Sequence, residues 1–236
     1  EPFESLFTQG MVCHETYKDE DENWLSPDEV ETNDGKRYFV RNQPSKKVKV
    51  GPAESMSKSK KNTIDPEKII SDFGADSVRL FILSDSPPEK DVQWSDEGII
   101  SSFKFLQKLW NLNSQILDEI QKDHKKDHDD LFDKMTNNFV DKVTNNLTKF
   151  TYNKIIANLH EMHSEISSIL KNNYSSKTIL NNYKKILVCM IPVTPHFANE
   201  CISKLSDKTQ LKWPDVDRAM LLEENIKYVI QINGKK

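Results

Sequence analysis

The second half of the chain repeats one pattern, in which apolar residues recur at alternating spacings of three and four positions. This spacing places the apolar side chains on one face of an α-helix. We predict four long helices from it, and a fifth helix that starts at Thr194-Pro195 with Thr194 as its N-cap. The predicted core positions are Ile99, Phe103, Leu106, Trp110, Asn113, Leu117 and Ile120 in the first helix; Leu131, Met135, Phe139, Val143 and Leu147 in the second; Ile155, Leu159, Met162, Ile166, Ile169 and Leu170 in the third; and Ile179, Tyr183, Ile186, Leu187 and Met190 in the fourth.

Short polar segments separate these apolar stripes, and one of them, residues 122–130, is strongly charged. Helices joined by short links pack as antiparallel neighbours, so we predict a helix bundle over this half of the chain. Ser95 is the predicted N-cap of the first helix, because a serine hydroxyl can satisfy a free N–H group of the first turn. We interpret the stripes as the core of the bundle and not as a cofactor site.

The first part of the chain instead combines short apolar runs with turn residues, which is typical of strands. Residues 1–17 contain one such run, predicted as a strand near the edge of a sheet, and residues 38–40 and 48–50 are predicted as two further strands. Between them, residues 19–34 hold eight acidic residues and no basic one. We interpret this segment as a solvated acidic ribbon that turns at residues 33–36, since it lacks the glycine and glutamate positions of a calcium loop.

Two short helices are predicted between the strands and the bundle. Asp65 and Pro66 are typical of a helix start, and the helix is expected to run over residues 67–73. Gly74 is well placed as its left-handed C-terminal residue. A second helix is expected over residues 75–83, ahead of two consecutive prolines.

Residues 54–62 form a basic, hydroxyl-rich stretch in which three lysines and three serines surround one methionine. Between Arg41 and Lys61 there are seven basic residues and one acidic residue, although the whole chain has a formal net charge of -4. Anionic ligands are the usual reason for such a basic island, since ammonium, hydroxyl and N–H groups together satisfy phosphate oxygens. Gly51 and Pro52 predict a hinge before it. We therefore predict a mobile loop that closes on a polyanion such as a phosphate chain.

Residues 55–59 resemble the KMSKS signature of class I aminoacyl-tRNA synthetases. The similarity extends over essentially the whole chain, in the same order, to the bacterial-type leucyl-tRNA synthetase family. Valyl- and isoleucyl-tRNA synthetases share the architecture, but the blocks at residues 8–11 and 231–235 favour leucine. The matching blocks are residues 1–3, 6–12, 56–62, 74–81, 86–89, 94–98, 195–196 and 231–235.

The resemblance implies a mainly α fold with a small α/β part. Residues 1–66 would be the end of a Rossmann-type catalytic domain with a short β-ribbon and the KMSKS-like loop, and residues 67–98 a stem-contact region. Residues 99–225 would form an antiparallel tRNA-binding bundle of the anticodon-binding type, and residues 226–236 the first strand of a further C-terminal domain. The implied ligands of the full enzyme are leucine, ATP with Mg²⁺, and tRNA(Leu). We expect that enzyme to be monomeric and cytoplasmic, without membrane contact.

In this family the leucine carboxylate attacks the α-phosphate of ATP, pyrophosphate leaves, and the leucyl group then passes to the tRNA 3′ end. Lys58 matches the family lysine assigned to ATP, where it would stabilise the charge that accumulates on pyrophosphate. By the same resemblance, Ser57 and Ser59 would hold the loop and donate to phosphate oxygens. Met56 would anchor the loop from beneath.

The loop departs from the family pattern at Ser55, where the consensus has lysine. Either Lys60 or Lys61 supplies the missing charge, or the affinity for phosphate is lower than in the family. Lys60, Lys61 and Arg79 are also the residues we expect to contact tRNA, Arg79 because its helix would lie near the acceptor stem. Asp76 and Arg79 lie three positions apart and are expected to pair on one helix face.

Gly10 and Met11 resemble the family segment beside the adenine pocket, where a glycine lets the backbone approach the base. A strand bulge is the alternative interpretation of Gly10. No metal site is predicted, because His160 and His163 lack the spacing of an H-E-x-x-H motif and a clear third ligand. We expect both to be surface histidines.

Several features of a complete synthetase are absent from these 236 residues. A class I enzyme also needs an H-x-G-H signature, and none of the six histidines has that setting. We therefore expect this chain alone to form no adenylate, to charge no tRNA and to hold no bound cofactor. The three widely spaced cysteines contain no C-x-x-C pair and fit a reducing cytoplasm. A non-catalytic helical RNA-binding or scaffold protein with a basic loop is the alternative.

Overall fold

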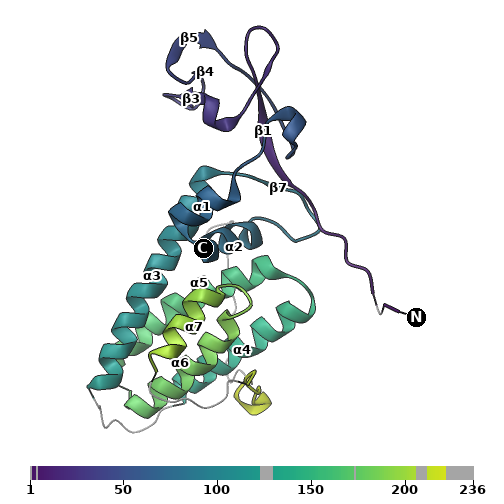
Figure 1. Cartoon of the computed structure of the whole chain (residues 1–236). Coiled ribbons are helices and arrows are strands. Elements are labelled where there is room, and N and C mark those ends of the chain that lie inside the picture. Colours follow the sequence, from purple (N-terminus) through teal and green to yellow (C-terminus); the bar gives the residue numbers. More distant parts are fainter. Residues whose placement is uncertain (1, 4, 123–129, 173, 206–211, 222–236) are drawn as a thin grey trace, which may run out of the picture.

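The computed structural model describes the chain except for residues 1, 4, 123–129, 173, 206–211 and 222–236. Its β-rich portion comes from the first part of the sequence and stands on a helical portion built from the rest (Figure 1). The predicted mainly α fold with a small α/β part is confirmed. The strand expected within residues 226–236, and most of the charged link at residues 122–130, lie outside the described residues.

The central sheet has four strands, in which β2, β1 and β6 are consecutive and β7 pairs in parallel with β1. Cys13 of β1 lies opposite Ser55 of β6 in an antiparallel pair, so the start of β1 is beside the end of β6. The apolar run of residues 1–17 becomes a strand only from Val12 onward, because Leu6 is exposed and Phe7 stacks on Phe150 of the helical portion, with ring centroids 5.0 Å apart. The strand bounds are β1 (Val12–Lys18), β2 (Trp24–Leu25), β6 (Lys49–Ser55) and β7 (Val92–Gln93).

Strand β6 runs through the position where a hinge was predicted, and that prediction is wrong. Gly51 and Pro52 lie inside the strand, next to a shift in the β1–β6 register between His14 and Thr16. A proline is tolerated here because β6 is an edge strand with an irregular ladder, where a missing N–H costs little. Gly51 is needed for another reason, since a Cβ at this position would lie 2.4 Å from Thr16 Oγ1.

Strand β3, which lies within the acidic ribbon, forms a second, three-stranded sheet with the two strands that follow it, in the order β3-β4-β5. The predicted strand over residues 38–40 is present, whereas β5 was not predicted, because all five of its residues are exposed and show no apolar alternation. Tyr17, Leu25 and Val30 form a small core between the two sheets. The bounds are β3 (Val30–Thr32), β4 (Tyr38–Val40) and β5 (Gln43–Lys47), preceded by the 3-10 helix η1 (Pro27–Glu29).

Helices α1 (Pro66–Phe73) and α2 (Ala75–Ser84) connect the sheets to the bundle. The Asp65 carboxylate accepts the N–H of Glu67 at 3.0 Å, which confirms the predicted N-cap. Gly74 has the expected positive φ of 80°, but its ψ of 151° is extended, so α2 begins immediately after it. Helix α2 faces two cores, because Leu80 packs into the bundle and Phe81 into a smaller cluster beside β7.

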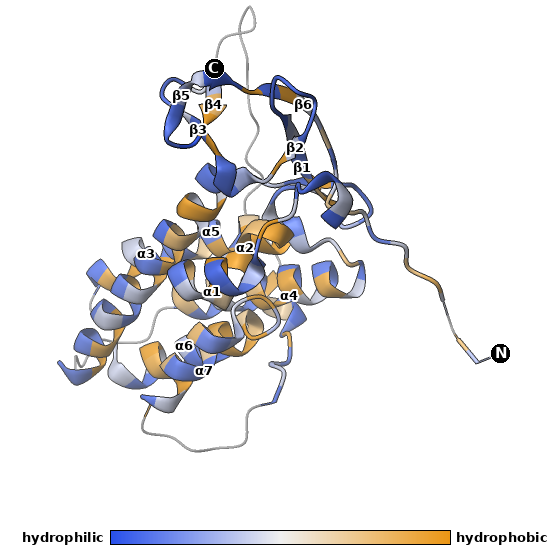
Figure 2. Ribbon diagram, turned by 45° about the horizontal axis from the view of Figure 1, so that its top comes forward, coloured by the Kyte–Doolittle hydropathy of each residue, from blue (hydrophilic) through white to orange (hydrophobic). Residues whose placement is uncertain are grey.

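The bundle contains five helices among the described residues, and Figure 2 shows hydrophobic and hydrophilic residues, in orange and blue, alternating along their ribbons. The predicted N-cap Ser95 accepts the N–H of Gly98 at 3.1 Å. The predicted stripes of α4, α5 and α6 pack in the core, except that Leu131 is exposed. No helix in the described part of the chain is long and apolar enough to cross a membrane. The bounds are α3 (Asp96–Gln121), α4 (Leu131–Thr148), α5 (Tyr152–Ile169), α6 (Ser176–Met190) and α7 (Pro195–Ser203), with 3-10 helices η3 (Leu170–Asn172) and η4 (Arg218–Leu221).

The core stripe predicted for α3 is confirmed only in part. Ile99 and Asn113 are buried as predicted, and Leu106, Leu117 and Ile120 pack against the bundle core, but Phe103 and Trp110 are not buried. Helix α3 packs on two sides, against the bundle and against α1, and both faces are apolar. Trp110, predicted to be core, is 38% exposed and lines an open cavity of about 930 Å³ together with Phe103 and Leu106. The residues that α3 buries are Ile99, Phe105, Leu109, Leu112, Asn113 and Ile116.

Candidate functional site

The basic loop leaves the sheet at Ser55, the last residue of β6, and reaches the first residue of α1 eleven residues later. The N–H of Met56 donates to the carbonyl of Val12 at 3.3 Å, which extends the β1–β6 pairing by one step. Residues Lys58–Lys60 then form one turn of 3-10 helix, η2. Lys61 follows in the left-handed region with φ 53° and ψ 18° and turns the chain back beneath the loop.

The three lysines of the loop have different partners. Lys60 forms an ion pair with Glu54 of β6, and Lys61 Nζ lies 3.6 Å from Glu29 Oε2 in the acidic ribbon. Lys58 is exposed and makes no ion pair within the described part of the chain. Exposed ion pairs contribute little to stability, so an anion can replace these carboxylates at small cost. Lys58 is the cation that is already available to a ligand.

The Glu29 carboxylate also has hydrogen-bond partners of its own in Ser26. It accepts the N–H of Ser26 at 2.8 Å, and this hydrogen bond, ahead of the Ser26 hydroxyl and Lys61, keeps the pKa of Glu29 below its usual range. These contacts favour the charged form of Glu29 beside Lys61 of the basic loop. Sequence reasoning treated the ribbon as a solvated face, and missed that one of its carboxylates pairs with a loop lysine.

The loop serines differ in exposure, since Ser55 and Ser59 are exposed and Ser57 is half-buried. Ser57 Oγ and Ser59 Oγ are 2.7 Å apart, and the Ser59 side chain is exposed. Ser55 is also exposed, so the position where the related family has lysine faces solvent. Met56 is half-buried. In the sequence these two serines flank Lys58, and hydroxyls and an ammonium together are a donor set suited to phosphate oxygens.

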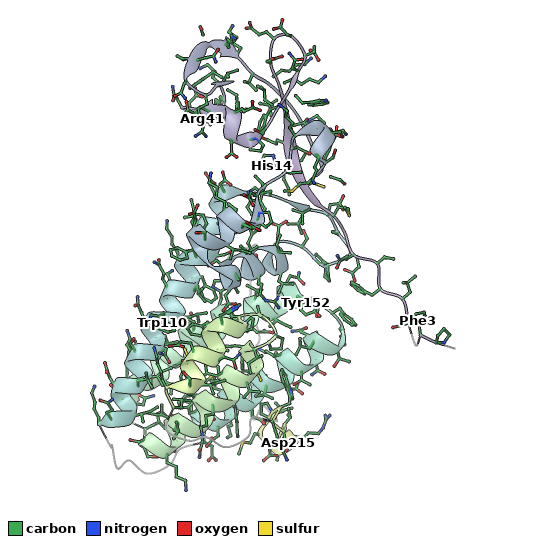
Figure 3. All side chains as sticks on the ribbon, viewed as in Figure 1. Phe3, His14, Arg41, Trp110, Tyr152 and Asp215 are labelled. Atoms are coloured by element: carbon green, nitrogen blue, oxygen red, sulfur yellow. The ribbon has the colours of Figure 1, made fainter. Side chains whose placement is uncertain are left out.

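Gly10 and Met11 lie just before β1, at the same end of the β1–β6 pair as the loop. The N–H of Gly10 donates to the carbonyl of Pro88 at 2.8 Å, and a Cβ at Gly10 would lie 2.1 Å from the carbonyl oxygen of Lys90. The backbone of residues 90–91 thus approaches Gly10 so closely that only a glycine fits here, independently of any ligand. Met11 is 56% exposed, and its N–H donates to Asp91 Oδ1 at 2.8 Å. Figure 3 shows His14, a little further along β1, where the β1–β6 pair approaches the helices.

Asp76 and Arg79 do not pair with each other as predicted, because both reach the turn between α6 and α7. The Asp76 carboxylate, 3% exposed, accepts the N–H of Phe197 at 2.7 Å and lies 3.0 Å from His196 Nδ1. Arg79 donates from Nε to the carbonyl of Val193 at 3.1 Å and from Nη2 to that of Pro192 at 2.6 Å. Asp76 therefore caps α7, and α2 is fastened to the bundle.

Asn62 is the residue beneath the loop that sequence reasoning left without a role. Its side chain is 0% exposed, and its Oδ1 accepts the N–H of Ser57 at 2.8 Å. Its Nδ2 donates to the carbonyl oxygens of His14 and Glu54 at 3.2 and 3.1 Å. The one available signal was its place at the end of the block of residues 56–62 that resembles the family.

The two histidines considered as metal ligands lie on α5, beside Phe105 of α3. The His160 ring stacks on the Phe105 ring with centroids 3.7 Å apart. Burial lowers the pKa of both His160 and His163, and the charge of Lys108 acts in the same direction. Within the described residues, no group of three or more His, Cys, Asp or Glu side chains is arranged to hold a metal ion.

Comparisons with known proteins match both halves of this architecture. A family model described as "tRNA synthetases class I (I, L, M and V)" matches residues 48–95, and one described as "Anticodon-binding domain of tRNA ligase" matches residues 129–236. The leucine–tRNA ligase of Bartonella henselae is 40% identical over 250 residues, which cover 100% of this chain and 28% of that protein. That of a Chelativorans species is 38% identical over 250 residues, covering 100% of this chain and 29% of that protein.

Solved structures show the same fold at lower identity. The ternary complex of Agrobacterium radiobacter LeuRS with tRNA and LeuAMS aligns with a TM-score of 0.65 and 23% identity, over 77% of this chain and 24% of that one. Mycobacterium tuberculosis methionyl-tRNA synthetase in complex with methionyl-adenylate aligns with a TM-score of 0.52 and 18% identity, over 62% and 35%.

A KMSKS-like loop, a connecting helix pair and an anticodon-binding type of bundle, in this order, place the chain in the class I aminoacyl-tRNA synthetase family. Within that class it groups with the leucine–tRNA ligases, to which it is similar along its whole length. The chain spans 28% of the length of the first of these relatives, less than a third of a leucine–tRNA ligase.

Proposed function

We propose that the chain is the part of a leucine–tRNA ligase that supplies the pyrophosphate-facing loop and the tRNA-binding helices. The observation that carries this proposal is the exposed ammonium of Lys58, free of a carboxylate among the described residues and flanked by the hydroxyls of Ser57 and Ser59. Leucine attacks the α-phosphate of ATP, the bond to the β-phosphate breaks, and pyrophosphate leaves with additional negative charge. A fixed ammonium at this position stabilises the transition state more than the ground state.

The remaining loop residues support Lys58 in this proposal. Ser57 and Ser59 donate to phosphate oxygens, and Met56 anchors the start of the loop to β1. Lys60 and Lys61 exchange their carboxylate partners for phosphate, or for tRNA, when a ligand arrives. Mg²⁺ enters as the counter-ion of ATP. Gly10 and Met11, at the same end of the β1–β6 pair as the loop, are proposed to border the adenine.

Lys58→Ala in a full-length leucine–tRNA ligase that contains this chain tests the assignment. We expect leucine-dependent ATP–pyrophosphate exchange to fall by about 10²–10³, the typical effect of losing one preorganised charge at a transition state. Lys36→Ala is the control, because it removes an exposed lysine between β3 and β4, outside the loop. Full exchange activity in Lys58→Ala would overturn the assignment. The 236-residue chain by itself is expected to show no exchange, and measurable exchange would contradict that expectation.

The bundle is proposed to contact the backbone of tRNA(Leu). A groove of about 430 Å³ between α6 and residues 212–215 supports this, because its walls include Lys184, Lys185 and Lys212 beside the ring of Trp213. Basic side chains next to an aromatic surface suit a nucleic-acid backbone and an unstacked base. Lys60, Lys61 and Arg79 are further proposed contacts, on the side of the acceptor stem.

Binding of leucine and non-leucine tRNAs to the chain, measured against salt concentration, tests this proposal. Phosphate contacts predict an affinity that falls linearly on a log–log plot, and Lys185→Ala is expected to reduce the magnitude of the slope by about 1. Lys36→Ala again serves as the control. An affinity that does not change with salt would exclude a phosphate-driven contact.

We further propose that the complete enzyme acts as a monomer in the cytoplasm. All three cysteines are buried free thiols, which supports a reducing compartment. We also propose the division into residues 1–66, 67–98, 99–225 and 226–236. Its first three parts are supported by hydrophobic cores between the two sheets, beside β7 and in the bundle, with Leu80 of the second part packing into the bundle core. Light scattering of the full-length enzyme, with and without tRNA, tests the proposed monomer.

A further inference from the structure

The Asn62 amide lies wholly inside the protein, directly beneath the basic loop. A buried amide is unfavourable unless both its oxygen and its nitrogen find partners. Asn62 satisfies this on three separate segments: its oxygen accepts from Ser57 in the loop, and its nitrogen donates to His14 in β1 and to Glu54 in β6. The Ser55 carbonyl lies a little further away, at 3.5 Å.

These partners lie at an irregular part of the sheet. The β1–β6 register shifts between His14 and Thr16, so regular backbone pairing is interrupted next to the loop. Donation by Asn62 to the carbonyls of His14 and Glu54 ties the two strands together there through a side chain. The base of the loop is therefore held by the Asn62 side chain as well as by the backbone hydrogen bonds between β1 and β6.

The hydrogen bond from Ser57 to Asn62 also closes the loop across its base. Only residues 58–61 lie between these two partners, and they contain the η2 turn and the left-handed Lys61. A non-glycine residue persists in that conformation only when its surroundings hold it there. Lys58 and Ser59 are thereby presented to solvent from a fixed base.

We propose that Asn62 is a positioning residue, whose buried amide sets the conformation of the phosphate-binding loop and so the place of the Lys58 ammonium. The phosphate ligand in this inference rests on the proposed function. The role of Asn62 in setting the loop conformation does not depend on it. Asn62 touches no ligand. It acts through Ser57 and Lys58.

A first measurement needs no substitution. In the 236-residue chain, NMR is expected to show slow hydrogen exchange at the Ser57 amide and at the Asn62 side-chain NH₂, at least about tenfold slower than at the exposed Asn33. If the Asn62 NH₂ exchanges as fast as that of Asn33, the inference is overturned, whatever the variants do.

Substitutions then connect Asn62 to the ligand, with inorganic tripolyphosphate as the probe. Asn62→Ala is expected to abolish the protection of the Ser57 amide from hydrogen exchange. It is also expected to weaken tripolyphosphate binding by roughly tenfold, because the loop loses the hydrogen bond that positions Lys58. Asn62→Asp keeps the oxygen that accepts from Ser57 but loses the donor to the two strands. It is therefore expected to retain Ser57 protection and still bind tripolyphosphate more weakly than the unsubstituted chain. Thr63→Ala, a neighbouring exposed position, is the control.

The outcomes separate this inference from the proposed function. If Lys58→Ala binds tripolyphosphate as tightly as the unsubstituted chain, the proposed function fails, while exchange at Ser57 still reports on Asn62. If Lys58→Ala weakens binding but Asn62→Ala changes neither binding nor Ser57 exchange, the positioning role is wrong and the proposed function stands. Should Asn62→Ala fail to fold, Asn62→Asp and the exchange rates of the unsubstituted chain decide.

Discussion

The carboxylate of Asp76 on α2 accepts the backbone N–H of Phe197 on α7 at 2.7 Å, across 121 residues of sequence. The N–H of His196 points at the same carboxylate, at 3.4 Å. The first N–H groups of a helix have no partner within the helix, and a carboxylate that meets them satisfies both the hydrogen bonds and the helix dipole. The segment that follows the basic loop is thus joined to α7, the last helix of the bundle in the sequence, by a capping interaction.

We predict that Asp76→Ala lowers the free energy of unfolding by roughly 2–3 kcal/mol, because it leaves the first turn of α7 without its buried acceptor. Asp76→Asn keeps one acceptor oxygen and should cost about 1 kcal/mol. Denaturant unfolding of the 236-residue chain measures both values. Asp72→Ala, an exposed aspartate on α1, is the matched control and should change the value by no more than about 0.5 kcal/mol. Equal effects of Asp72→Ala and Asp76→Ala would contradict the capping role.

Arg79 holds the same turn from the other side, through the carbonyl oxygens of Pro192 and Val193. Arg79→Met keeps the aliphatic stem and removes both hydrogen bonds, so we expect a loss of about 1–2 kcal/mol. Because Asp76 and Arg79 secure one turn, their effects should not add, and the double variant should deviate from the sum by at least about 0.5 kcal/mol. Strict additivity in a double-mutant cycle would show that the two residues act independently.

Two substitutions in the loop are expected to strengthen phosphate binding. Glu54→Gln removes the carboxylate that pairs with Lys60, and Ser55→Lys places a cation at an exposed position beside it. Since exposed ion pairs are weak, each change should tighten tripolyphosphate binding by only about twofold to fivefold at low salt. Titration calorimetry of the chain measures the change, and Glu67→Gln, an exposed acid in the first turn of α1, is the control. Weaker binding by Glu54→Gln would mean that the ion pair orients Lys60 productively.

The stability of the bundle should depend on pH through His160. Burial lowers the pKa of this ring from its ordinary value of 6.5, so the folded chain favours the neutral form. Below pH 6.5 the ring becomes protonated in the unfolded chain before it does so in the folded chain. The free energy of unfolding therefore decreases as the pH falls through the lower pKa of the folded state. His160→Phe keeps an aromatic ring against Phe105 without a titrating group. Thermal unfolding between about pH 7.5 and 5 should show a smaller loss for His160→Phe, and parallel curves would refute the role of His160.

The N-caps and the inner stripes were predictable from the sequence because their signals are local. Asp65 and Ser95 bond to N–H groups two and three residues ahead, so their chemistry is contained in a few adjacent positions. The stripes of α5 and α6 were equally clear, since each of these helices has one apolar face. The basic loop was recognised for the same reason, as a run of consecutive residues.

Helix α3 and strand β6 show where local signals are insufficient. Helix α3 is apolar on two faces, and only the positions of α1 and of the bundle decide that Phe105 and Leu109 are buried while Trp110 lines a cavity. In β6, Gly51 and Pro52 have the local preference of a hinge, but pairing with β1 across a register shift keeps them extended. Each outcome depends on a neighbour that is distant in the sequence.

The sequence by itself therefore determined the class of fold, the helix starts and the loop with Lys58, because each depends on residues close together in the chain. Only the tertiary structure decided which carboxylates meet Lys60 and Lys61, that Asp76 and Arg79 serve α7, and that Asn62 lies buried beneath the loop. The physical reason is that a polar side chain takes the partners that folding brings within about 3 Å, and sequence patterns specify faces and turns but not such long-range partners.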